Sequence, residues 1–361
     1  MQRGNNFLSV AFVWSVLLAG WIASHLEPSG RQPMSVGTPD PHTGVASSAR
    51  ERRAGANAES PSEIPASGWW NVLKRAFAGF SSDRVMANAA AVTFYTLLAL
   101  FPAIAALISL YGMFADPSHL SEQVQGLAGI IPGGGIDILK AEVASLTASG
   151  RGALSSGVII GLLASLWSAN AGVKAFFDAL NVVYHEDEKR SFVRLTLTAF
   201  CFTLGLILFA ILALLAIVGV PVVLNFIGLK SVTDLIIRIA RWPVMLVIVS
   251  VLLAALYRYG PSRNKARWRW VSWGGAFAAV LWIAASLGFS FYVTNFGSYN
   301  KTYGSLGAVV GFMTWIWISS IIVLMGGEIN AELEQQTQRD STVGPEKPRG
   351  TRGAYKADVK A

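Results

Sequence analysis

Charged residues are scarce in this sequence. Only 14% of its 361 residues are Asp, Glu, Lys or Arg, whereas 53% are hydrophobic. A soluble domain carries about 25% charged residues, so this chain has too little charge to cover its whole surface in water. Cysteine is almost absent as well, because Cys201 is the only one. A single cysteine excludes an intramolecular disulfide framework and a cysteine-cluster metal site.

Histidine is also rare and scattered. The four histidines form no His-x-His pair and no His-Glu-x-x-His motif, which are the patterns that supply ligands in zinc and two-metal hydrolases. The sequence contains no Gly-x-Ser-x-Gly nucleophile elbow either. We therefore predict that the chain is not an enzyme and that it binds no metal and no cofactor.

Long apolar runs are what the sequence has in excess. A helix needs about 20 apolar residues to cross a hydrocarbon core of ~30 Å. Six such runs lie approximately at residues 88–114, 152–184, 195–224, 242–257, 271–296 and 304–327, and residues 235–240 can extend the short fourth one. The predicted fold class is all-α, a polytopic transmembrane helical bundle with six core spans.

An amphipathic stretch precedes the first of these spans. Trp69, Trp70 and Phe77 oppose Lys74 and Arg75 in it, a pattern typical of a helix that lies in the membrane interface. We take it as the start of a membrane domain at residues 69–334. The residues that follow, 335–361, are polar and basic, and we predict a disordered cytoplasmic tail.

Residues 1–68 form an N-terminal extension. Its apolar segment at 7–26 has three interpretations: an extra span, a cleaved signal peptide, or the product of an upstream start codon, with Met34 as the true start. The linker at 27–67 is rich in Pro, Ser, Gly and Ala, and it lacks the apolar content needed to fold. We therefore predict that this linker is disordered.

Basic residues set the predicted orientation, because Lys and Arg favour the cytoplasmic side of a membrane. The segments on one side (69–87, 185–194, 258–270 and the tail) hold 17 of them, and the segments on the other side (115–153, 221–241 and 294–303) hold 6. We predict a multi-pass protein of the bacterial inner membrane whose core begins and ends in the cytoplasm. The net charge of +8 then reflects topology, and we expect no nucleic-acid partner.

Three separated stretches carry a family resemblance. They read AAAVTFYTLLALFPAIAALISLYG (89–112), LWSANAGVKAFFDALNVVYHEDEKRSF (166–192) and LGFSFYVTNFGSYNKTYGSLGAVVGFMTWIWISSIIVLMGGEINAELE (287–334). In these stretches the chain resembles the YihY/BrkB family of bacterial inner-membrane proteins. The resemblance implies a six-helix bundle with both termini inside. The family once carried the label ribonuclease BN, and elsewhere it is associated with serum resistance and with envelope or lipid handling.

The sharpest polar pattern within a span is Asn170, Lys174 and Asp178. Their i, i+4, i+8 spacing places them on one helical face, and Asn181 falls close to the same stripe. Charged residues within a span usually face a partner or a water-filled cavity. These four residues therefore line a substrate path, or alternatively they mark the cytoplasmic end of a long helix where Lys174 pairs with Asp178.

Glu328 and Asn330 close the sixth run, directly after two glycines. They either approach another helix or simply mark where the helix leaves the membrane. Contact between Glu328 and Lys174 or Arg194 across the bundle would favour a functional role. Small residues such as Gly274 and Ala278 in the fifth run predict close helix packing.

Residues 294–303 form a short predicted hairpin on the outer side, between the fifth and sixth runs. Asn295, Asn300 and Lys301 are its polar candidates. They either only connect the two spans or act as a gate or lipid contact.

The predicted function is transport or handling of a small molecule, an ion or an envelope lipid. The expected partners are membrane lipids and a small-molecule or lipid substrate. One alternative is a non-catalytic envelope scaffold. A second alternative, a membrane-bound ribonuclease, is disfavoured because the sequence has no cluster of metal ligands.

Overall fold

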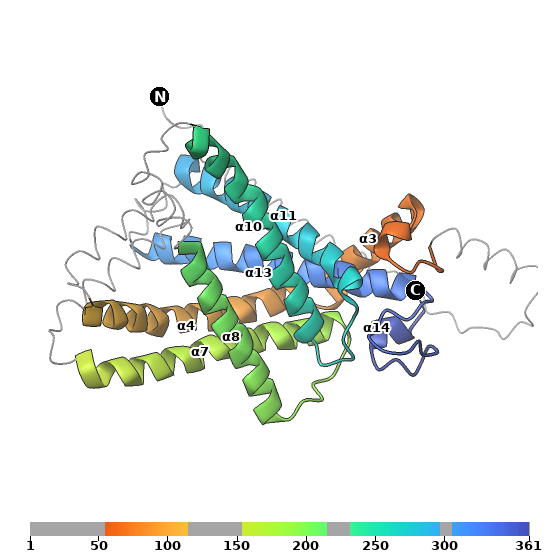
Figure 1. The fold of residues 1–361 in the computed structure, drawn as a ribbon, viewed down its shortest axis with the longest axis horizontal. Helices are drawn as coiled ribbons and strands as arrows, with labels where there is room; N and C mark the ends of the chain where they lie inside the picture. Colours follow the sequence, from red (N-terminus) through yellow and green to blue (C-terminus); the bar gives the residue numbers. More distant parts are fainter. Residues whose placement is uncertain (1–54, 115–153, 215–231, 297–304, 361) are drawn as a thin grey trace, which may run out of the picture. The chain divides into compact units, whose positions relative to one another are not determined.

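The computed structural model describes residues 55–114, 154–214, 232–296 and 305–360 (Figure 1). The named elements in these residues are all helices, which confirms the predicted all-α class. The six long ones correspond to the six predicted spans: α4 (Val85–Phe114), α7 (Leu154–Val183), α8 (Phe192–Leu214), α10 (Val232–Tyr259), α11 (Trp268–Phe296) and α13 (Ser305–Gln336). The apolar segment at 7–26 lies outside the described residues.

Three described helical segments are long and apolar enough to cross a membrane. They are Phe192–Phe209, Trp268–Val293 and Val309–Gln336, with mean hydropathies of 2.0, 1.9 and 2.0. Shorter apolar segments, Val85–Ala99 and Pro243–Tyr259, belong to α4 and α10. Only 11% of the first segment and 17% of the second are buried, so most of their apolar side chains face outwards, where lipid would meet them.

Helix α13 has contacts with more of the other helices than any other described element. It touches α4, α7, α10, α11, α3 and α14, whereas α8 packs mainly on α7. The pairs α4–α7 and α10–α11 run side by side (Figure 1). The largest buried cluster joins α4, α7, α10, α11 and α13 through residues such as Val92, Leu180, Tyr257, Val271 and Leu324.

Close packing of the fifth span is confirmed. A Cβ added to Gly326 of α13 would lie 2.8 Å from the Ala278 side chain and 2.8 Å from the Gly274 carbonyl oxygen on α11. On the other side of α11, a Cβ at Gly275 would lie 2.8 Å from the Ser250 carbonyl oxygen of α10. Real Cβ atoms are not found at such distances, so these glycines let α11 fit between its two neighbours.

The amphipathic stretch forms helix α3 (Ala66–Ser82), which buries Val72 and Ala76. Ahead of it, residues 55–65 are packed rather than disordered, and they include the short helix η1 (Pro61–Glu63). Ala58 and Ile64 join a buried cluster with Trp270 of α11, and the Thr337 hydroxyl donates a 2.6 Å hydrogen bond to the Ala58 carbonyl. The predicted disordered linker is therefore wrong for its last part, because apolar contacts anchor it.

The C-terminal segment also differs from the sequence prediction. Helix α13 continues through Gln336, and residues 337–360, which we call the C-terminal cap, fold against it and include α14 (Tyr355–Asp358). Arg352, only 3% exposed, donates to four backbone carbonyls of the cap. Asp340 accepts bonds from the Thr342 and Lys347 amides. Composition predicted disorder because the cap has few apolar residues, but its charged side chains bind its own backbone instead.

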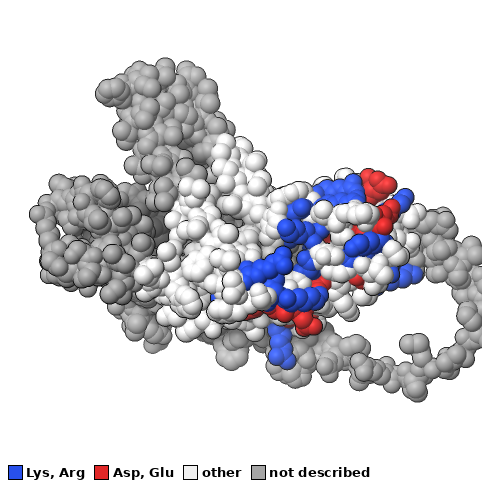
Figure 2. All heavy atoms as spheres, turned by 60° about the horizontal axis from the view of Figure 1, so that its bottom comes forward, with Lys and Arg blue, Asp and Glu red and all other residues white. Residues whose placement is uncertain are grey.

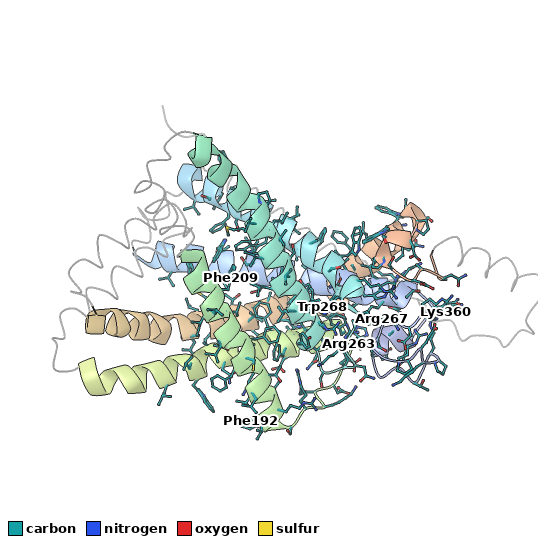
Figure 3. The ribbon with its side chains drawn as sticks, in the orientation of Figure 1. Phe192, Phe209, Arg263, Arg267, Trp268 and Lys360 are labelled. Carbon is teal, nitrogen blue, oxygen red and sulfur yellow. The ribbon has the colours of Figure 1, made fainter. Side chains whose placement is uncertain are left out.

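Charged side chains gather at one end of the described region, where α14 and the cap lie, and the other visible described surface is largely uncharged (Figure 2). Figure 3 shows Arg263, Arg267 and Lys360 at this end, next to the start of α11 at Trp268. The Arg267 Nε donates a 2.9 Å bond to the Thr342 carbonyl, so the loop ahead of α11 holds the cap. This charged end is the part of the protein that would meet water.

Candidate functional site

The four polar residues of α7 have different surroundings and share no common partner in the described part of the chain. Asn170 is 2% exposed and its Oδ1 has no hydrogen-bond partner among the described residues. Lys174 donates a 2.9 Å bond from Nζ to the Thr196 hydroxyl on α8, and its Nζ lies 4.8 Å above the Phe192 ring. Lys174 therefore joins α7 to α8. The structure gives it no ion pair with Asp178, which is exposed.

Asn181 and the loop after α7 tie the ends of two helices together. Its Oδ1 accepts a 2.7 Å bond from the Ser262 amide beyond α10, and its Nδ2 donates 3.0 Å to Glu188. Burial alone would raise the pKa of Glu188, but hydrogen bonds from Arg190 and Asn181 lower it to about 2. Arg190 also donates to the Gly260 carbonyl at 2.8 Å. These bonds connect the end of α7 and the loop after it to the loop after α10.

Asn330 is a clamp between α13 and α11. Its Oδ1 accepts a 2.8 Å bond from the Gly274 amide, and its Nδ2 donates 3.1 Å to the Val271 carbonyl. A Cβ added to Gly274 would lie 2.5 Å from the Asn330 side chain, so the glycine is what lets the Asn330 amide reach the backbone of α11.

Glu328 is fully buried, and it contacts neither Lys174 nor Arg194. Its side chain lies against α3, where a Cβ added to Gly79 would be 2.8 Å from Oε2. Both carboxylate oxygens lack a hydrogen-bond donor among the described residues. Its neighbours are Asp83, which ends α3, and Lys356 of the cap.

Asp83 and His185 form a pair that the sequence prediction missed. The His185 Nε2 lies 3.0 and 3.2 Å from the two Asp83 oxygens. Arg84 and His185, which belong to this cluster, have φ values of 51° and 55°, a strained region for residues other than glycine. The paired residues lie 102 positions apart in sequence, so neither spacing nor periodicity could have found the pair.

The other acidic residues at the end of α13 are matched by bases. Arg75 and Lys356 both bind Glu332, at 2.5 and 2.7 Å. Arg263 makes two hydrogen bonds of 2.7 and 2.8 Å to Glu334, and both side chains are almost completely buried. Burial would lower the pKa of the Arg263 guanidinium, but the adjacent Glu334 carboxylate raises it above its ordinary value.

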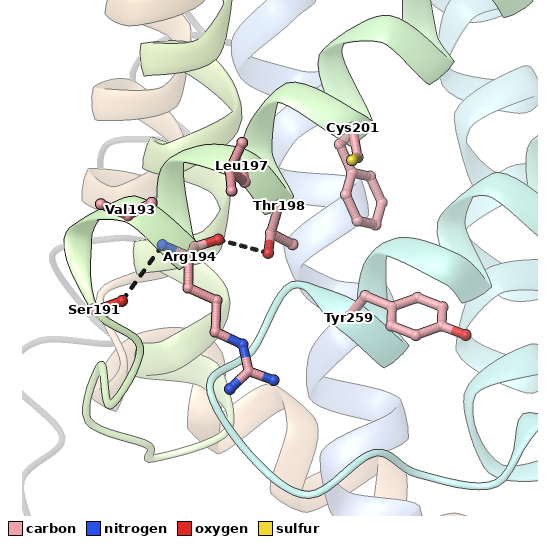
Figure 4. A pocket seen from close by; sticks show the side chains of 8 residues that line it. Ser191, Val193, Arg194, Leu197, Thr198, Cys201 and Tyr259 are labelled. Atoms are coloured by element: carbon pink, nitrogen blue, oxygen red, sulfur yellow. Dashed lines mark hydrogen bonds between the residues drawn. The ribbon is translucent and has the colours of Figure 1, made fainter.

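A groove of about 530 Å³ lies beside the first turns of α8 (Figure 4). Its lining is Ser191, Val193, Arg194, Leu197, Thr198, Cys201, Phe202 and Tyr259. The polar side chain Thr198 already donates to the Arg194 carbonyl at 2.8 Å. Cys201 is exposed in the groove as a free thiol. The lining is mostly apolar, with one cation at its edge.

Arg194 differs from its basic neighbours. Lys189 binds Glu186 at 2.7 Å, Arg190 binds Glu188 at 2.6 Å, and Arg258 donates to the Ala266 carbonyl. The Arg194 guanidinium, in contrast, makes no hydrogen bond or ion pair with any residue that the structure describes, although its backbone bonds to Ser191 and Thr198. It is the cation of this region that remains available to a ligand.

The predicted outer hairpin is largely outside the described residues. The backbone of Asn295 belongs to α11, whereas Asn300 and Lys301 lie outside the described part of the chain. Within the described part, no group of three His, Cys, Asp or Glu side chains could hold a metal ion.

Comparison with known proteins identifies relatives over most of the chain. The family described as Virulence factor BrkB matches residues 76–351. The ribonuclease-like protein YfkH of Bacillus subtilis is 30% identical over 276 residues, covering 73% of this chain and 95% of its own. A UPF0761 membrane protein of Vibrio campbellii is 27% identical over 269 residues, covering 73% of this chain and 81% of its own. No solved structure matches.

Proposed function

The chain belongs to the Virulence factor BrkB family of membrane proteins, and we propose that it handles an anionic membrane lipid whose headgroup binds Arg194. The observation that carries this proposal is the groove beside α8, where an unengaged guanidinium lies at the edge of an apolar lining. Of the ligand classes expected from sequence, a small molecule, an ion or a lipid, only an amphiphilic anion fits both parts of the groove.

The groove has a cation for the headgroup of a lipid and an apolar lining for its acyl chain. A guanidinium binds a phosphate through two parallel hydrogen bonds, and Arg is weakly hydrated enough to do so at an interface. Arg194 is near the start of the apolar segment Phe192–Phe209, so it lies where headgroups are found. From there the lining extends to Phe202, about 12 Å along the helix at 1.5 Å per residue, which suits the first carbons of an acyl chain.

The charged end of the protein supports the choice of an anionic lipid. We propose that this end faces the cytoplasm at the bacterial inner membrane, with both ends of the six-helix unit inside, because basic residues concentrate there. The cytoplasmic leaflet carries the anionic lipids, which attract basic residues by about 1 kcal/mol each. The groove would then open to the leaflet that supplies its ligand.

Cys201 permits a direct test, since it is the only cysteine of the chain and lies in the groove. The protein is reconstituted in nanodiscs of phosphatidylcholine with and without phosphatidylglycerol, and alkylation of Cys201 by N-ethylmaleimide is timed. We expect phosphatidylglycerol to slow alkylation several-fold. Arg194→Gln should remove this difference.

Arg269→Gln is the matched control. Arg269 is exposed near the start of the apolar segment of α11 and does not line the groove, so this variant should keep the difference. Equal alkylation rates in both lipid mixtures for the unaltered protein would refute lipid binding in the groove and would favour the scaffold alternative. If both variants lost the effect of phosphatidylglycerol on the alkylation rate, the effect would come from surface charge in general and not from Arg194.

Binding is the first step of the proposed role, and movement is the second. The role is non-enzymatic: the lipid is bound and presented or moved without a covalent change. Liposomes with fluorescent phosphatidylglycerol in both leaflets can test movement, because dithionite bleaches only the outer one. If the unaltered protein lets dithionite bleach more than the outer leaflet, and Arg194→Gln lets it bleach less, the protein moves the lipid between leaflets.

A further inference from the structure

Glu328 is the one acidic residue at the described charged end whose burial and surroundings do not match its expected charge. Its side chain is 0% exposed, yet neither oxygen meets a donor among the described residues. Glu332 and Glu334 lie one turn or so further along the same helix, and each binds a base at 2.5–2.7 Å. An unpaired buried carboxylate is strongly destabilising, so something must neutralise Glu328.

The structure limits what the neutralising group can be. The helix backbone at Gly79 closes over the carboxyl group, because even a Cβ there would lie 2.8 Å from Oε2. The described residues near it include no third acidic, His or Cys side chain in a position to complete a metal site. Lys356 is close enough to act on Glu328 electrostatically, but its Nζ is bound to Glu332 at 2.7 Å.

The same end of α3 that covers Glu328 at Gly79 carries another acid, Asp83, one turn further on, and this acid acts on Glu328 electrostatically. Two ionised carboxylates are both acceptors and repel each other, so a hydrogen bond between them requires one proton. Asp83 is itself held by the His185 Nε2 at 3.0 Å and by the Ser82 hydroxyl at 3.1 Å. Asp83 therefore has hydrogen-bond partners of its own, whereas Glu328 has none among the described residues.

We propose that Glu328 and Asp83 share one proton and form a proton-binding site at the inner end of the last span, which His185 connects to water. The His185 side chain is 41% exposed, whereas that of Asp83 is 8% exposed, so the three side chains lead from the surface to a buried carboxyl. When His185 takes a proton from water at Nδ1, it can release the one on Nε2 to Asp83, which passes a proton to Glu328. Starting from a Glu328 that has lost its proton, water loses one proton, Glu328 gains one, and His185 ends neutral with its proton on Nδ1.

The backbone at this site supports a functional role. Arg84 and His185 are the two non-glycine residues with positive φ among the described residues, at 51° and 55°, and both adjoin Asp83 or belong to its pair. Such backbone strain is found preferentially at functional sites. The other titratable groups that face Glu328 are Glu332 on its own helix, Lys356 of the cap and the buried Tyr184 of α7.

Infrared spectroscopy tests for the proton directly. At neutral pH the ionised carboxylates have no carboxylic-acid C=O stretch, so a shared proton on Glu328 should give a band that shifts in D₂O. We expect this band in the purified full-length protein, its loss in Glu328→Gln, and a changed frequency in Asp83→Asn. A spectrum in which Glu328→Gln and the unaltered protein have the same acid band would overturn the proposal.

Thermal stability gives an independent readout, with Glu334→Gln as the matched control on the same helix. A glutamine resembles a protonated glutamate, so Glu328→Gln should melt within a few degrees of the unaltered protein at neutral pH. Glu334→Gln should melt much lower, because it leaves Arg263 buried without its anion. Above neutral pH the unaltered protein should lose stability relative to Glu328→Gln, since losing the proton creates an unpaired buried charge.

Two outcomes would contradict the shared proton. One is a Glu328→Gln variant that fails to fold or melts as low as Glu334→Gln, which would mean that Glu328 is ionised and needed as an anion. The other is a melting temperature that rises with NaCl and not with choline chloride, in the unaltered protein but not in Glu328→Gln. That result would assign the site to a sodium ion.

Discussion

The buried pair Arg263–Glu334 provides the sharpest test of how the charged end is held together. Arg263 precedes α11 and Glu334 lies in the last turns of α13, and their side chains are 1% and 0% exposed. The guanidinium makes two hydrogen bonds to the carboxylate and lies 4.2 Å from the Tyr184 ring. The Ser341 hydroxyl adds a 2.8 Å bond from the cap to Glu334. Three parts of the protein therefore depend on this pair.

Arg263→Met removes the charge and keeps an apolar side chain that can lie on Tyr184. The remaining Glu334 charge is buried without a base, so we expect this variant to lose about 3–5 kcal/mol of unfolding free energy. The double variant Arg263→Met with Glu334→Gln has no uncompensated charge, and the amide oxygen of the introduced glutamine still accepts the Ser341 bond. Replacing both members of a buried pair is often close to neutral, so the double variant should be more stable than Arg263→Met alone.

Equilibrium unfolding by SDS in mixed micelles can measure all three proteins. Arg339→Met serves as the control, because Arg339 pairs with Glu59 and Glu346 at 3.8 and 3.4 Å while about half exposed. An exposed pair of this kind contributes about 0–1 kcal/mol. The reasoning fails if Arg263→Met costs no more than Arg339→Met, or if the double variant is no more stable than Arg263→Met alone.

Three further outcomes follow from the packing. Gly326→Leu should prevent stable folding in a detergent melting assay, because overpacking costs about 1–3 kcal/mol or more. The control Gly288→Ala, with nothing within 4 Å of its Cβ, should melt no lower than the unaltered protein. Equal melting temperatures for the two variants would contradict the close approach of α11 and α13. The folded pKa of Glu188 lies below its ordinary value of 4.5, at about 2, so its stabilisation is complete above pH 4.5 and is lost as the pH falls to about 2. Glu188→Gln should therefore flatten the acid-unfolding curve in that window, modestly because the side chain is partly exposed to solvent, and an unchanged slope would refute this. Deleting residues 1–67 should lower the melting temperature more than deleting 1–54, since only the longer deletion removes the anchored segment before α3; equal melting temperatures would contradict the anchor.

The length of the apolar runs was sufficient to predict the six long helices. Each of the six apolar runs became a long helix, since a segment without charge has few other ways to satisfy its backbone in a membrane. Even the weak fourth run is part of a longer helix, α10, that begins at Val232 and includes the suggested extension at residues 235–240. The helix ends were harder to predict, because α13 continues past Gly327 to Gln336, and only its partners explain why.

Composition misjudged the segments at both ends of the membrane domain. Residues 55–65 and the C-terminal cap contain few large apolar residues, so counting them predicts disorder. The structure stabilises them by specific contacts between distant parts: Thr337 with the Ala58 carbonyl, Lys356 with Glu332, and Arg267 with the Thr342 carbonyl. Long-range polar pairing of this kind leaves no periodic pattern in a single sequence.

Two polar residues near the end of α13 look alike in the sequence but have different surroundings in the structure. Glu328 and Asn330 are two positions apart, so they point about 200° away from each other around the helix. Asn330 meets the start of α11, where the Gly274 amide and the Val271 carbonyl satisfy its amide group. Glu328 meets α3, where no donor among the described residues reaches its carboxylate. The sequence gives both residues the same appearance, but only one of them has its burial cost met by neighbouring groups. The other requires a proton, and that difference is why Glu328 rather than Asn330 is the residue to examine for function.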